Sequence, residues 1–65
     1  MKIIAHTKYG KFETQPTDYS EEEYTKLQNF MSTVTDSKFL TLNTENGFIY
    51  LPKEIIQDTL FEIEK

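Results

Sequence analysis

The chain lacks residues on which several kinds of protein chemistry depend. Its 65 residues contain no cysteine, no tryptophan and no arginine. Without cysteine there is no disulfide and no thiolate zinc site, the usual means of stabilising so small a domain. Arginine is the side chain preferred for bidentate contacts with phosphate and guanine. Its absence, together with a net charge of −4, argues against DNA or RNA as the main partner.

Other absences bear on catalysis, cofactors and membranes. His6 is the only histidine, so a Ser-His or Cys-His relay has one candidate base, and no activated serine stands near it. The two glycines, Gly10 and Gly47, are placed for turns and form no phosphate-binding loop. No metal motif, signal peptide or membrane-length apolar run is present. We therefore expect a cytoplasmic protein that is not an enzyme and has no metal, cofactor or membrane contact.

The residues that are present suffice for one small folded domain. Hydrophobic residues make up 37% of the chain and charged residues 28%, which is typical of a globular rather than a disordered protein. Four tyrosines and five phenylalanines supply bulk for a core. A domain of this length buries only about 60% of the surface of its unfolded chain. We expect residues 1–65 to form a single domain of modest stability.

The strongest local signal is Asn46-Gly47, within the segment 38–51. If these two residues form a type I′ turn, Glu45 faces Phe48 and Leu42 faces Leu51 in a β-hairpin. Because strand side chains alternate between faces, the hairpin then has an aliphatic face and an aromatic one. The first carries Leu40, Leu42, Ile49 and Leu51, and the second carries Phe39, Thr41, Asn43, Phe48 and Tyr50.

The segments on either side predict the rest of the fold. Residues 1–7 and 11–14 suggest a first hairpin that turns at Tyr9-Gly10. Ser20 and Glu23 have the spacing of a capping box, which predicts a helix over 21–34 with an apolar stripe. We expect this stripe to lie on the aliphatic face of the central hairpin.

The C-terminal residues complete the prediction. Pro52 suits the first position of a short helical turn, and a strand over 59–64 follows with Phe61 and Ile63 inward. The predicted fold is therefore α+β, in the order β-β-α-β-β-β. It consists of an antiparallel sheet of two hairpins plus a C-terminal strand, with one helix packed on one face.

The aromatic face of the central hairpin is the main candidate site. One helix covers only one face of a sheet, so Phe39, Phe48 and Tyr50 stay open unless loops or chain ends fold over them. Phe and Tyr are enriched at the centres of interfaces. Our first hypothesis is a non-enzymatic protein-interaction module that binds a protein partner, or a second copy of itself, through this face.

Carboxylates supply the alternative hypotheses. Asp18, Glu21, Glu22 and Glu23 could make the chain an acidic nucleic-acid mimic that blocks a nucleic-acid-binding protein, although acids at a helix start also favour the helix itself. A pair of carboxylates on the last strand, Glu62 and Glu64, could do acid–base work. They alternate with apolar residues, however, as in any half-exposed strand.

The last 28 residues, KFLTLNTENGFIYLPKEIIQDTLFEIEK, resemble the C-terminal halves of small proteins encoded by phages and prophages of low-GC Gram-positive bacteria. The lysine-, isoleucine-, asparagine- and glutamate-rich composition fits A/T-rich coding DNA of that kind. The resemblance implies a cytosolic accessory protein that acts on a host factor. It contains no catalytic motif, and it implies no particular site residues.

Overall fold

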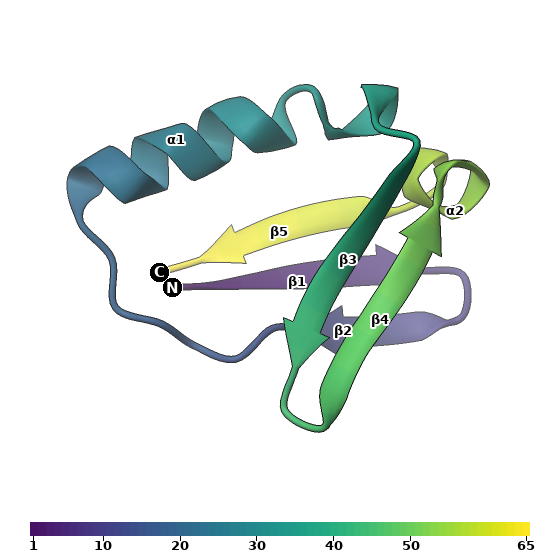
Figure 1. The fold of residues 1–65 in the computed structure, drawn as a ribbon, viewed down its shortest axis with the longest axis horizontal. Coiled ribbons are helices and arrows are strands. Elements are labelled where there is room, and N and C mark those ends of the chain that lie inside the picture. The colour runs from purple at the N-terminus through teal and green to yellow at the C-terminus, as the bar shows by residue number, and fades with distance from the viewer.

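The computed structural model describes all 65 residues, and it contains five strands, one main helix and shorter helical segments (Figure 1). In chain order the elements are β1 (Lys2–Thr7), β2 (Gly10–Glu13), α1 (Glu21–Met31), the 3-10 helix η1 (Val34–Asp36), β3 (Phe39–Thr44), β4 (Gly47–Pro52), α2 (Lys53–Gln57) and β5 (Leu60–Glu64). This order confirms the predicted α+β class and the predicted succession of strands around one main helix.

The strands form two antiparallel sheets, where the sequence predicted one. β1 is the central strand of the first sheet, with β2 and β5 on its two sides, and β3 and β4 make up the second. The last strand therefore returns to the first, and the two chain ends lie side by side in Figure 1. This division gives the aliphatic face of the β3–β4 hairpin a second sheet to pack against.

The core lies between the two sheets and is closed by η1 and α2. Its five buried residues are Ala5, Val34, Leu42, Leu51 and Ile56. The expectation that the main helix covers the aliphatic face is wrong, because α1 contains no buried residue. A continuous strand face buries more apolar area against another strand face than against the narrow stripe of an 11-residue helix.

Helix α1 begins where the sequence predicted and ends one turn earlier than residue 34. The Ser20 hydroxyl accepts a hydrogen bond from the Glu23 N–H at 3.2 Å, which confirms the expected N-cap. At the other end, the hydroxyls of Ser32 and Thr33 donate to carbonyls one turn back. Such bonds compete with helix propagation. The chain then tightens into η1, which turns Val34 into the core.

Both hairpins have two-residue loops with the pattern Thr-x-x-Gly. The loops are 8–9 and 45–46, and the glycine after each begins the next strand at positive φ, +134° for Gly10 and +149° for Gly47. The type I′ turn predicted at Asn46-Gly47 is therefore wrong, because Asn46 does not take a positive φ. The first turn likewise begins one residue before the expected Tyr9-Gly10.

The register of β3 against β4 differs from the prediction by two residues. Leu42 faces Ile49 and Leu40 faces Leu51, whereas the predicted turn had Leu42 opposite Leu51. A shift of two residues leaves every side chain on its predicted face. The observed register also places all four aliphatic side chains opposite one another, which favours it over the predicted one.

Candidate protein-interaction surface

The outer face of the β3–β4 hairpin presents three aromatic rings to solvent. Phe39 is 56% exposed, Phe48 66% and Tyr50 57%. Neither loops nor chain ends fold over them, so the face that the sequence left open is open in the structure. We refer to these three residues as the aromatic face. They are the predicted interface residues, and the structure places all three on one hairpin.

The strand pairing sets the geometry of these rings. Tyr50 faces Thr41, and Phe39 is the diagonal neighbour of Tyr50 on the same side of the hairpin. The Phe39 and Tyr50 rings are stacked, with centroids 5.6 Å apart and an interplanar angle of 16°. Because both stand on paired strands rather than on a loop, they form a preorganised apolar surface.

A pocket of about 510 Å³ adjoins the aromatic face. It opens between β4, α2 and the loop end of the β1–β2 hairpin. The residues that line it are Thr7, Tyr9, Phe12, Ile49, Tyr50, Leu51, Pro52 and Ile55, none of which is charged. We refer to it as the β4 pocket. Tyr50 belongs both to it and to the aromatic face.

Sequence reasoning did not find the β4 pocket. The sequence predicts only a turn at Tyr9, whereas in the structure Tyr9 is 72% exposed and lines the pocket. An aromatic side chain in a two-residue loop, where small polar residues are usual, is the one local signal that could have indicated it. The approach of the first hairpin to β4 depends on how the two sheets cross, which no local pattern reports.

The acidic group of the alternative hypothesis lies at the start of α1. Asp18, Glu21, Glu22 and Glu23 are all exposed, and they are close together in the chain. Part of this charge has a structural role, since the Glu23 carboxylate accepts a hydrogen bond from the Ser20 hydroxyl at 3.3 Å. Negative charge on a first helical turn also stabilises the helix through the macrodipole.

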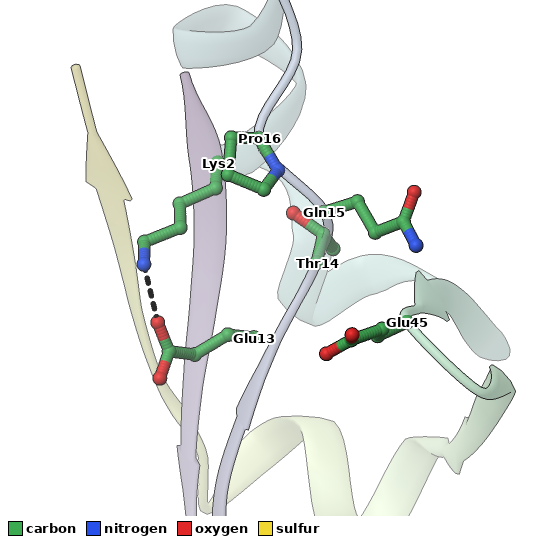
Figure 2. Close-up of a pocket in the computed structure, with 6 residues that line it drawn as sticks. All are labelled: Lys2, Glu13, Thr14, Gln15, Pro16 and Glu45. Carbon is green, nitrogen blue, oxygen red and sulfur yellow. Dashed lines mark ion pairs between the residues drawn. The ribbon is translucent and has the colours of Figure 1, made fainter.

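Ion pairs link the three strands across the outer face of the first sheet. Lys2 Nζ lies 2.6 Å from Glu13 Oε1 on β2 and 3.8 Å from Glu64 Oε1 on β5. The hydrogen bond from Lys2 lowers the pKa of Glu13, and the same bond raises the pKa of Lys2. Figure 2 shows this pair beside a polar pocket of about 490 Å³, whose other walls are residues 14–16 and Glu45. Pro16 is the one apolar residue that lines this pocket, and the pocket's one cation is already paired.

The remaining candidates for chemistry also have partners across the β1–β5 strand pair. His6 Nε2 lies 3.0 Å from Glu62 Oε1, and Glu64 approaches Lys2. The two carboxylates that could have done acid–base work thus each face a basic side chain on β1. No three His, Asp or Glu side chains come together where they could hold a metal ion.

No helix of the chain has both the length and the apolar character needed to cross a membrane. Comparisons with protein-family models, with curated proteins and with solved structures find no match. The surface chemistry of the chain is therefore the basis for inferring its function.

Proposed function

We propose that this chain is a non-enzymatic protein-interaction module that binds a protein partner through its aromatic face. The proposal rests on the exposure of three aromatic rings together on one hairpin. Rings of this kind supply contact area at little cost in side-chain entropy, which is why they concentrate in interfaces. The resemblance of residues 38–65 to phage and prophage proteins favours a host factor as the partner.

The area of the rings gives the hydrophobic contribution to such binding. An aromatic side chain has roughly 200 Å² of surface, and exposures of 56 to 66% leave about 350 Å² to be covered. At ~25 cal/mol per Å² this coverage contributes about 9 kcal/mol. The cost of association is about 4–15 kcal/mol. The aromatic face therefore supports weak binding by itself, and tight binding needs further contacts around it.

A variant that carries both Phe48→Ser and Tyr50→Ser tests the proposal. The variant and the unaltered chain are immobilised, and proteins retained from an extract of a low-GC Gram-positive bacterium are identified by mass spectrometry. We expect at least one protein to bind the unaltered chain and not the variant. Leu60→Ser is the matched control, because Leu60 is 70% exposed on the first sheet rather than on the second.

Circular dichroism separates a loss of binding from a loss of folding. If the double variant unfolds, the rings are needed for folding and do not form an interface. A double variant that stays folded and retains the same proteins would place the interface elsewhere. Sedimentation velocity measures self-association. If the unaltered chain forms a dimer and the double variant does not, the partner is a second copy of the chain.

The second candidate function is the acidic mimic of nucleic acid. It is favoured by the four exposed carboxylates of Asp18, Glu21, Glu22 and Glu23 at one end of α1. Salt separates the two candidates, because raising the ionic strength to about 1 M shortens the Debye length to about 3 Å and weakens exposed charge contacts. A partner held by the aromatic face stays bound at high salt. A partner of the mimic is released, and it also fails to bind a chain with Glu21, Glu22 and Glu23 changed to Gln.

A further inference from the structure

In the β1–β2 hairpin, one backbone hydrogen bond shows which pairs of opposite residues are hydrogen-bonded. The Thr14 N–H donates to the Ile3 carbonyl at 2.9 Å, in line with the β1–β2 ladder. Along an antiparallel ladder, pairs of opposite residues alternate between hydrogen-bonded and non-hydrogen-bonded ones. Counting from Ile3 and Thr14, every second pair is therefore hydrogen-bonded, and the last of these pairs is Thr7 with Gly10. The pair that closes the two-residue loop is therefore a hydrogen-bonded pair.

The second hairpin has the same loop, closed by Thr44 and Gly47. Its bonded pairs therefore use the odd-numbered residues of β4. The backbone N–H and C=O groups of Phe48 and Tyr50 point the other way, toward a side on which β4 has no neighbouring strand. Pro52, which has no N–H, also falls at a non-bonded position, as proline in a strand requires.

This free edge of β4 has no charge to protect it. Exposed edges are usually blunted by charged side chains, proline or short length. The outer strands of the first sheet follow that rule, because β2 carries Lys11 and Glu13 and β5 carries Glu62 and Glu64. β4 reads GFIYLP over six residues, contains no Lys, Asp or Glu, and has its one proline at the last position, beyond the outward-facing groups of Phe48 and Tyr50. Such an edge is suited to accept another strand.

The β4 pocket lies along this free edge. It touches residues 49–52, which point to both faces of β4, and it touches no residue of β3. The pocket therefore lies next to the edge of β4 that is opposite β3. Tyr9, Phe12 and Ile55 form its other walls. An extended segment on the edge would direct every second side chain toward these apolar walls.

We propose that an extended segment of the partner protein pairs antiparallel with β4 and becomes the third strand of the second sheet. Apolar side chains at alternate positions of the segment enter the β4 pocket, while the intervening ones lie beside Phe48 and Tyr50. The outward N–H and C=O groups of these two residues bind the segment's backbone. This inference rests on the proposed function, and it specifies the form of the partner.

Charges near the pocket indicate one end of the segment. Lys8 adjoins Tyr9 and Lys53 adjoins Pro52, and neither forms an ion pair. Glu54 is the one acid without an ion pair that is next to a lining residue. An antiparallel segment begins beside Pro52. An acidic residue at its N-terminal end therefore complements Lys53, which directly follows Pro52 in the chain.

A second copy of the chain fits the same edge less well. Twofold pairing of β4 with β4 would bring the other copy's first sheet into the layer that Tyr9 and Phe12 occupy. The aromatic face offers about 350 Å², less than half of the about 800 Å² that each partner buries in a standard interface. A single strand needs less area, because main-chain hydrogen bonds contribute much of its affinity.

The probe is a displayed library of random nine-residue peptides, selected on the complete folded chain. We expect the enriched peptides to have apolar residues at alternating positions and Asp or Glu before them. The chain is short enough for total synthesis, so the outward N–H of Tyr50 can be replaced by N-methyl. We expect a selected peptide to bind this chain at least about tenfold more weakly, since the methyl group removes a hydrogen bond and blocks the edge.

Thr41 provides the matched control. It faces Tyr50 across the hairpin, and its N–H points to the opposite edge of the sheet. N-methylation there should leave peptide affinity unchanged. Lys53→Glu should weaken binding of peptides with an acidic N-terminal end while leaving the fold intact, because Lys53 is exposed and unpaired.

Amide hydrogen exchange in the unmodified chain is a second readout, which serves even if an N-methyl chain fails to fold. We expect the amides of Phe48 and Tyr50 to exchange quickly in the free chain and slowly with peptide bound. Those of Ile49 and Leu51 should be protected in both states.

Three results would overturn the inference. One is that no peptide is enriched. Another is that selected peptides bind, but the amides of Phe48 and Tyr50 stay unprotected from exchange and N-methylation of Tyr50 does not weaken the binding. If those peptides are lost on Phe39→Ser, the aromatic face still binds protein and only strand pairing fails. If they are unaffected by Phe39→Ser, the proposed function fails as well. The last is that, without peptide, the amides of Phe48 and Tyr50 become protected from exchange as the protein concentration rises. This result would show that a second copy of the chain pairs with the edge.

Discussion

The substitution Ile56→Ala tests where the core of this protein lies. Ile56 is the largest side chain that is completely buried, and it packs among the other four core residues from β1, η1, β3 and β4. Truncating such a side chain removes its transfer free energy and leaves a cavity, at a cost of about 2–5 kcal/mol. A chain of this length is expected to have a total stability of about 3–10 kcal/mol. The substitution therefore removes a large part of the free energy of unfolding.

Leu27→Ala is the comparison. Leu27 is half-buried on α1, a helix without a buried residue, and we expect its truncation to cost about 1 kcal/mol. Gln28→Ala, at an exposed position of the same helix, is the neutral control and should stay within about 0.5 kcal/mol of the unaltered chain.

Urea unfolding followed by circular dichroism measures these costs, and thermal unfolding provides a check. In a domain of this size 1 kcal/mol corresponds to about 4–8 °C in Tm, so Ile56→Ala should lower Tm by at least about 10 °C. If Leu27→Ala costs as much as Ile56→Ala, the core lies beneath α1, and the packing of the two sheets described above is wrong.

Three further predictions concern the turn, an ion pair and the helix cap. Gly47→Val should cost about 1–3 kcal/mol because Gly47 has φ +149°, although no atom lies within 4 Å of an added Cβ; an unchanged urea midpoint would contradict this. The pKa of Glu13 is lowered by Lys2, so its stabilisation is complete above the ordinary value of 4.5 and is lost as pH falls through the lower pKa of the folded chain. Below pH 4.5, Tm should therefore fall less steeply in Glu13→Gln than in the unaltered chain, and equal slopes would rule out a stabilising pair. Ser20→Ala should cost about 0.5–2 kcal/mol in urea unfolding, because the Glu23 N–H loses its cap; a cost near zero would show that α1 is uncoupled from the fold.

Local patterns in the sequence determined the kinds of element and their faces. Alternation along 39–44 and 47–52 separated an aliphatic face from the aromatic one, and the separation survived an error of two residues in register. The spacing of Ser20 and Glu23 placed the start of α1 because a cap acts within one helical turn. The three predicted interface residues could be grouped on one face without tertiary information, because alternate side chains of a strand point to the same face.

The turn shows where such local reasoning fails. Asn46-Gly47 favours a type I′ turn by itself, yet the chain places only Gly47 at positive φ. The observed register pairs Leu40 with Leu51 and Leu42 with Ile49 directly across the strands, and each such pair contributes about 0.2–1 kcal/mol. Packing therefore chose the register, and a dipeptide could not report it.

Only the tertiary structure decided what covers the aliphatic face and what lies beside the free edge. The sequence contains one long amphipathic helix, which made α1 the natural cover, but the two sheets pack on each other and leave α1 at the margin. The same crossing brings Tyr9 and Phe12 to β4 and creates the β4 pocket from segments about forty residues apart. Burial of apolar area is non-directional, so a sequence specifies which side chains must be buried and leaves their partners to the global arrangement of the chain.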